Sequence, residues 1–180
     1  RQLRAWWDAG FEIVPVSVNV SSAQFSDSNL QEIITDALVR HDVAPESLEI
    51  ELTESLILED NETTALALRD LRAIGVRVAL DDFGTGYSAL TYLNRFPLDA
   101  VKMDRGFLRS IEDDEAAAGI ASAVIAMSHS LGFEVVAEGV DSERQAQLLR
   151  SMACDQIQGF LYSPALPPLE ATRFLTPLGA

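Results

Sequence analysis

Cysteine, histidine and basic residues are scarce in this 180-residue sequence. It has one cysteine, Cys154, two histidines, and 13 lysine or arginine residues against 28 acidic residues. A single cysteine excludes an intrachain disulfide and favours a reducing compartment. The formal net charge of -15 argues against binding to DNA or RNA polymers, which requires a basic face. An anionic small ligand remains compatible, because bound divalent metals invert the local charge.

Long apolar runs are also absent. No run approaches the ~20 residues of a membrane span, and no secretory signal opens the chain, so we expect no direct membrane insertion. The composition, 48% hydrophobic and 23% charged, is typical of a globular protein and not of a disordered one. No Ser/Gly-rich linker interrupts the sequence, so we predict one domain over residues 1–180.

Short apolar segments alternate with longer helical ones. We predict strands at residues 13–20, 48–52, 76–80, 99–103, 133–137 and 154–160. Helices are expected at residues 28–41, 61–75, 88–96, 113–132, 142–152 and 169–175. This alternation predicts an α/β protein with a parallel sheet covered by helices.

Two folds fit this alternation, an open doubly wound sheet and a TIM-type (β/α)8 barrel. Strands of an open sheet are almost uninterrupted apolar runs, whereas Glu49 and Glu51 alternate with apolar residues here. No phosphate-binding GxGxxG turn follows the first strand. We therefore favour the barrel, with polar side chains near the axis at its mouth. Typical barrels have ~250 residues, so about two strands are unaccounted for.

The chain also begins unusually. "RQLRAWWDAG" is typical of the second half of an amphipathic helix that ends at Gly10. A domain rarely begins inside a helix, so we expect the missing strands upstream of Arg1. A barrel interrupted in this way exposes two strand edges. Such a fragment should be poorly soluble as a monomer or should pair with another copy. We therefore expect either that the natural protein continues upstream of Arg1, or that the 180-residue chain associates through these edges and is inactive.

Polar residues stand at the C-terminal ends of all six predicted strands. They are Asn19, Glu51, Asp81, Asp82, Lys102, Asp104, Glu138 and Gln158. In a barrel these ends converge on one mouth, where active sites lie. Oxygen ligands without His or Cys suit Mg²⁺ or Mn²⁺. Two adjacent buried carboxylates stay ionised if cations lie between them, so one of the Asp81–Asp82 pair is expected to bridge two ions.

Each residue also has an ordinary structural alternative. Asp104 could cap a helix, Lys102 could form an ion pair, and Glu54 could be a helix-start residue. Glu49 could face solvent or pair with an arginine. Independent capping does not explain a polar group at the end of every strand, so we favour a shared site.

Six segments, in order, resemble the signature segments of EAL domains, which are bacterial cyclic-di-GMP phosphodiesterases. They are "VSVNVSS", "EIELTES", "DDFGTGYSAL", "LDAVKMDRGFL", "VVAEGVDS" and "CDQIQGFLYSPAL". The resemblance covers essentially the whole chain and implies a (β/α)8-type barrel. It further implies metal-dependent hydrolysis of one phosphodiester bond of cyclic-di-GMP to linear pGpG. The implied cofactor is Mg²⁺ or Mn²⁺, as two ions, with Ca²⁺ inhibitory.

The resemblance also implies roles for individual residues. The implied metal ligands are Asn19, Glu51, Asp81, Asp82 and Glu138. The implied catalytic residues are Lys102, Glu138, Asp82 and Glu54. Lys102 matches a lysine that contacts the attacking water or the phosphate, and Glu54 matches an acid that anchors the "DDFGTGYS" loop and couples the site to dimerisation. Asp104 and Gln158 match residues on the substrate side of the same site.

One departure from the family pattern is the lack of a Glu-Ala-Leu segment, which by family spacing precedes Arg1. Its Glu is a metal ligand and a nearby Arg contacts phosphate, so we interpret the departure as truncation. The resemblance further implies a homodimer, linkage to sensory or GGDEF domains, and a cytoplasmic location, either free or in a membrane-anchored sensor. The main alternative is a non-catalytic cyclic-di-GMP receptor or protein-interaction module on the same scaffold. An unrelated metal-dependent barrel enzyme, such as an aldolase or enolase-like lyase, is a weaker one.

Overall fold

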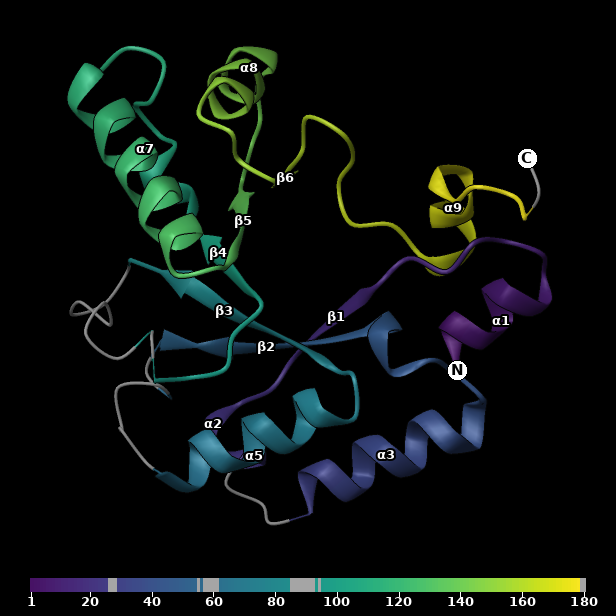
Figure 1. The fold of residues 1–180 in the computed structure, drawn as a ribbon. Helices are drawn as coiled ribbons and strands as arrows, with labels where there is room; N and C mark the ends of the chain where they lie inside the picture. Colours follow the sequence, from purple (N-terminus) through teal and green to yellow (C-terminus); the bar gives the residue numbers. More distant parts are fainter. Residues whose placement is uncertain (26–28, 55, 57–61, 85–92, 94, 179–180) are drawn as a thin grey trace.

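Six parallel strands form one curled sheet, a half-barrel, in the computed structural model (Figure 1). The structure describes residues 1–25, 29–54, 56, 62–84, 93 and 95–178. The strands are β1 (Val16–Asn19), β2 (Leu48–Thr53), β3 (Arg77–Phe83), β4 (Ala100–Met103), β5 (Glu134–Glu138) and β6 (Gln156–Gln158). Their spatial order follows the sequence from β1 to β6 without the reversal that defines a doubly wound sheet. The barrel-type prediction is therefore confirmed.

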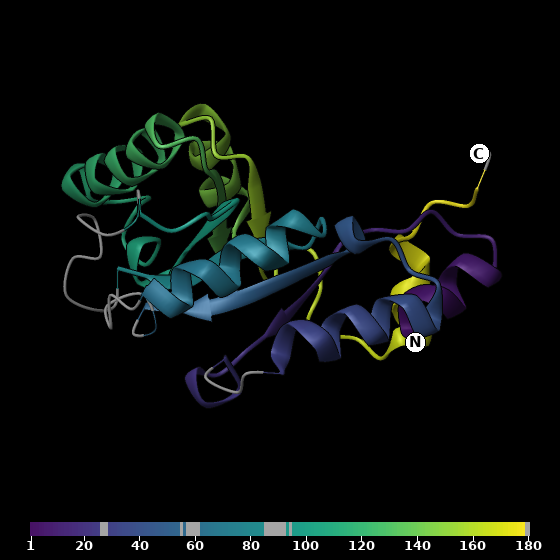
Figure 2. The same ribbon diagram turned by 60° about the horizontal axis from the view of Figure 1, so that its bottom comes forward.

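Helices cover the outer, convex face of the sheet (Figures 1 and 2). Those over this face are α3 (Leu30–His41), α5 (Glu62–Ala73), α7 (Glu115–Ser130) and α8 (Glu143–Ser151), whereas α1 (Gln2–Asp8), α2 (Ser22–Phe25) and α9 (Pro168–Ala171) lie beyond the ends of the strands. The described part of the chain also contains the 3₁₀ turns η1 (Pro45–Ser47), η2 (Arg105–Phe107) and η3 (Thr172–Phe174). The helices α3 and α5 lie side by side under β1–β3, whereas α7 and α8 lie next to β4–β6. None of the described helices combines the length and hydropathy that a membrane span needs.

Two apolar clusters join the helices to the sheet. In the first, Ile50 and Leu80 of the sheet pack with Leu68 of α5. In the second, Val135 of β5 packs with Ile125 of α7. All five side chains are almost fully buried, and each stabilises the fold by about 1.5–3 kcal/mol. Because the apolar residues face outward to the helices, the alternate positions of the strands face the barrel axis.

Most element boundaries agree with the sequence, and the differences have local causes. The strand β1 begins only after Pro15, which lacks the N–H that a sheet needs. The strand β3 is longer than predicted and contains both Asp81 and Asp82, and β6 covers only three of the predicted residues. The helix α1 ends at Asp8, and Gly10 follows its C-cap Ala9 in a left-handed turn with φ of 85°, so a glycine closes this helix as predicted. Most of the predicted helix at 88–96 lies outside the described residues.

Candidate metal-binding active site

Lys102 lies among four carboxylates at the C-terminal ends of the strands. These residues, Glu51, Asp81, Asp82 and Glu138, are called the acidic mouth below. Nζ of Lys102 lies 2.7 Å from Oε1 of Glu51, 2.6 Å from Oε1 of Glu138 and 3.6 Å from Oδ1 of Asp81. Lys102 and Glu51 are both 6% exposed. Lys102 is also the only lysine in the sequence. A buried ammonium group needs partners of this kind, because burying an unpaired charge is costly.

The carboxylates around Lys102 keep it protonated. Burial alone would lower the pKa of Lys102, but hydrogen bonds and attraction from Glu138 and Glu51 raise it well above its usual value. With these carboxylates around it, the ammonium group is charged at neutral pH. It supplies a fixed positive charge at the mouth.

Asp81 and Asp82 both contribute to the mouth although they are adjacent in one strand. Neighbouring side chains of a regular strand point to opposite faces of the sheet. Here the register with β4 shifts between Leu80 and Phe83, and Asp82 has a φ of 53°. This irregular, left-handed backbone brings carboxylate oxygens of Asp81, Asp82 and Glu138 within 4.8 Å of one another.

The mouth carries more negative charge than Lys102 can balance. Partial desolvation raises the pKa of Asp82, and Asp81 and Asp104 raise it further, against the attraction of Lys102. Burial likewise raises the pKa of Glu138. Four carboxylates face one ammonium group, those of Glu51, Asp81, Asp82 and Glu138. Closely spaced oxygen donors with surplus negative charge fit Mg²⁺ or Mn²⁺.

Asp104 and Glu54 have structural contacts beside this cluster. Oδ1 of Asp104 accepts a 2.8 Å hydrogen bond from the Gly106 N–H and caps η2, so its capping alternative is confirmed. The charge of Asp104 nevertheless acts on Asp82. Oε2 of Glu54 accepts a hydrogen bond of 3.4 Å from the N–H of Gly84, at the start of the loop that it was expected to anchor. Residues 85–92 of that loop lie outside the described residues.

Asn19 and Gln158 lie on the two outermost strands of the described sheet. Register pairs Asn19 with Glu51 and Gln158 with Glu138, so both residues flank the mouth. Both are exposed. The predicted site residues thus share one end of the half-barrel, whereas His41 and His129 lie late in α3 and α7 as predicted.

A second polar layer lies below the mouth. The guanidinium of Arg77 contacts Glu49 at 3.3 Å and Glu134 at 2.5 Å, and the hydroxyl of Ser17 donates to Glu49 at 2.8 Å. The arginine alternative for Glu49 is therefore confirmed. Arg77 and Glu134 were missed from the sequence, although each begins a strand at an inward-facing position. Two carboxylates face one guanidinium group in this layer, a smaller surplus than in the mouth, where four carboxylates face one ammonium group.

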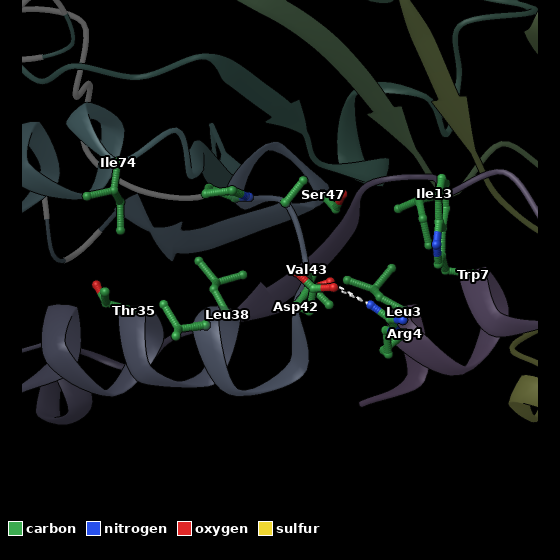
Figure 3. A pocket seen from close by; sticks show the side chains of 13 residues that line it. Leu3, Arg4, Trp7, Ile13, Thr35, Leu38, Asp42, Val43, Ser47 and Ile74 are labelled. Carbon is green, nitrogen blue, oxygen red and sulfur yellow. Dashed lines mark hydrogen bonds and ion pairs between the residues drawn. The ribbon is translucent and has the colours of Figure 1, made fainter.

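A cavity of about 690 Å³ lies at the other end of the sheet, between α1 and α3 (Figure 3). It is lined mainly by apolar side chains, including Leu3, Trp7 and Leu38. An ion pair of 2.5 Å between Arg4 and Asp42 crosses it. Its lining contains none of the predicted site residues, so it is separate from the acidic mouth.

Comparison with known proteins agrees with this arrangement. The family described as EAL domain matches residues 1–165. MucR of Pseudomonas aeruginosa, a bifunctional diguanylate cyclase/cyclic di-GMP phosphodiesterase, is 40% identical over 167 residues, which are 93% of this chain and 24% of MucR. The chain thus spans about a quarter of the length of curated relatives such as MucR and the signaling protein YkoW of Bacillus subtilis.

Solved structures share the fold as well. The MucR phosphodiesterase in complex with c-di-GMP has a TM-score of 0.87 at 39% identity, over 94% of this chain and 68% of that one. The EAL domain of Mycobacterium smegmatis DcpA has a TM-score of 0.92 at 35% identity, over 97% and 78%. A manganese/cy-diGMP complex of Klebsiella pneumoniae BlrP1 has a TM-score of 0.79 at 29% identity, over 89% and 41%. By its sequence, its half-barrel and the match over residues 1–165, the chain belongs to the EAL domain family.

Proposed function

We propose that this domain hydrolyses cyclic-di-GMP to linear pGpG, with divalent cations held at the acidic mouth. The observation that carries the proposal is the convergence of Asp81, Asp82 and Glu138 within 4.8 Å, beside the protonated Lys102. The named ligand of the MucR and BlrP1 structures supports the substrate, and manganese in the BlrP1 complex supports the metal.

The donor set divides into a central and a flanking part. Asp81, Asp82 and Glu138 would hold the cations, with Glu51 and Asn19 completing the coordination from β2 and β1. Bound divalent cations supply Lewis acidity, which activates water and neutralises phosphate charge. Two ions are proposed, because Asp81 and Asp82 are adjacent and each would offer carboxylate oxygens to cations at the same site. The acidic chain would then bind an anionic dinucleotide through its cations.

The remaining residues act on the substrate directly. Lys102 directs its ammonium charge at the phosphate oxygens, where negative charge increases during hydrolysis. Its raised pKa makes it an electrostatic group that keeps its proton. Gln158, next to Glu138 in the register, would donate its amide hydrogens to the dinucleotide. Asp104 would act on the substrate side through its charge near Asp82.

Analysis of the product of cyclic-di-GMP incubated with Mn²⁺ tests this function. The expected product is pGpG. The main alternative, a non-catalytic receptor or interaction module, is favoured if the dinucleotide binds but stays intact. The 180-residue chain and the protein as its gene encodes it are both assayed, because this chain spans only about a quarter of the length of relatives such as MucR. We expect turnover by the encoded protein, as a homodimer with attached signalling domains.

A further inference from the structure

The turn η2 lies between two segments of the mouth and touches a glycine in each. A Cβ atom added to Gly84 would lie 2.2 Å from the ring of Phe107, and one added to Gly139 would lie 2.6 Å from Cβ of Arg105. Both distances are shorter than real Cβ contacts, so Phe107 and Arg105 occupy the space where those side chains would be. Both glycines also have positive φ, 94° and 72°, which other residues resist.

These two glycines are close in sequence to the acids of the mouth. Gly84 follows Asp82 by two residues, and Gly139 follows Glu138 directly. The turn thus contacts the segment that carries the aspartates on one side and the segment that carries the glutamate on the other. A shift of the turn would move the two segments relative to each other.

The turn itself is firmly held. Oδ1 of Asp104 caps it through the N–H of Gly106. The next residue, Leu108, is 1% exposed and belongs to the second apolar cluster. Its carbonyl oxygen accepts a 3.1 Å hydrogen bond from Nε2 of Gln145, the residue that completes the capping box of α8. The apolar core and α8 therefore hold η2 in place. Through its contacts with Gly84 and Gly139, η2 in turn restricts the positions of the two segments that carry the acids of the mouth.

We propose that η2 is a positioning element, in which Phe107 on Gly84 and Arg105 on Gly139 set the separation between Asp82 and Glu138. This inference rests on the proposed metal site. Phe107 touches neither metal nor substrate in this role; it acts through the backbone that carries Asp82. Groups that orient metal ligands typically change metal affinity 10–100-fold when they are removed.

Mn²⁺ titration of metal-free variants tests the proposal, at a temperature where circular dichroism shows all of them folded. Phe107→Ala should weaken Mn²⁺ binding about tenfold, and Phe107→Leu should retain most of the affinity. The matched control is Phe133→Ala, which truncates a buried phenylalanine immediately before β5, at the other end of that strand from Glu138. It should lower thermal stability without changing the Mn²⁺ affinity. Equal affinity losses in Phe107→Ala and Phe133→Ala would overturn the proposal.

The glycines provide a second, independent comparison. Gly84→Ala adds a methyl group against Phe107 at positive φ, whereas Gly132→Ala meets nothing within 4 Å at a similar φ of 83°. Both variants pay for backbone strain, but only Gly84→Ala should weaken Mn²⁺ binding. Since Phe107→Ala frees the space that this methyl group needs, the double variant should lose less affinity than the two single losses added together. Additive losses would contradict contact between the two positions.

A metal-independent measurement separates this inference from the proposed function. If the wild-type domain bound no Mn²⁺, the proposed function would fail. Hydrogen exchange of the Gly84 N–H, which donates a hydrogen bond to Glu54, would then test the positioning role of η2 without any metal. Phe107→Ala should accelerate that exchange, and Phe133→Ala should not. Unchanged exchange in Phe107→Ala would overturn the positioning role whatever the metal does.

Discussion

Nζ of Lys102 lies 2.6 Å from Oε1 of Glu138, across the register of two neighbouring strands. The same ammonium group holds Glu51 at 2.7 Å. Lys102 thus neutralises part of a carboxylate cluster whose remaining charge is suited to cations. The lysine and the proposed cations share the carboxylates of the mouth, which makes Lys102 the residue whose removal distinguishes binding from chemistry.

Lys102→Met should abolish turnover and spare metal binding. Loss of one charge-stabilising group of this kind costs about 10²–10³-fold in kcat. Mn²⁺ affinity should stay the same or rise, because a competing cation has been removed and lysine is no ligand for a hard cation. Calorimetric Mn²⁺ titration and a cyclic-di-GMP assay measure the two effects separately. Near-normal hydrolysis by the variant would remove Lys102 from the mechanism.

Glu54→Ala should lower activity and alter dimerisation together, because Gly84 would lose the acceptor of its N–H at the start of the loop. A hydrogen bond to a charged group stabilises by about 1.5–3 kcal/mol. Glu62→Ala, in the first turn of α5, is the matched control and should lose only about 0.3–1 kcal/mol through the helix dipole. Turnover and sedimentation velocity are the measurements. A Glu54 variant that behaves like the Glu62 variant would make Glu54 an ordinary helix-start acid.

Arg77→Met should destabilise the domain without affecting metal binding. It leaves Glu49 and Glu134 without their shared cation, at the opposite end of the strands from the mouth. We expect a loss of about 1–3 kcal/mol in the free energy of unfolding, measured with urea. Arg69→Met, at an exposed position of α5, is the control. A large change in Mn²⁺ affinity in Arg77→Met would show that the two polar layers are coupled.

Asp155 should stabilise the fold at neutral pH and lose this effect in acid. Partial burial would raise the pKa of Asp155, but hydrogen bonds from His129 and from the Val135 N–H outweigh it and lower the pKa. A lowered folded-state pKa contributes stability above the usual value of about 3.9 and loses it as pH falls through the folded value. Asp155→Asn should therefore melt below wild type at neutral pH, and the difference should disappear as the pH falls through the lowered folded-state pKa of Asp155. A pH-independent difference in melting temperature would contradict this.

The sequence predicted the parallel half-barrel and the convergence of polar strand ends, because alternation and strand direction determine both. Glu51 and Lys102 face the axis for this reason alone. The alternation does not predict that Asp82 turns to join Asp81, since that depends on a register shift and a left-handed φ. Contacts between segments that are distant in the sequence could not be predicted from it either. Phe107 on Gly84 has no sequence signal beyond the glycine itself.

The most direct test of the central claim is pGpG formation by the encoded protein, measured against Mn²⁺ concentration. The claim is that the acids of the mouth hold the cations that this hydrolysis needs. Metal-stripped protein should form no pGpG, added Mn²⁺ should restore a saturable rate, and Asp81→Asn should lose most of that rate. Hydrolysis that survives both a chelator and Asp81→Asn would contradict the account.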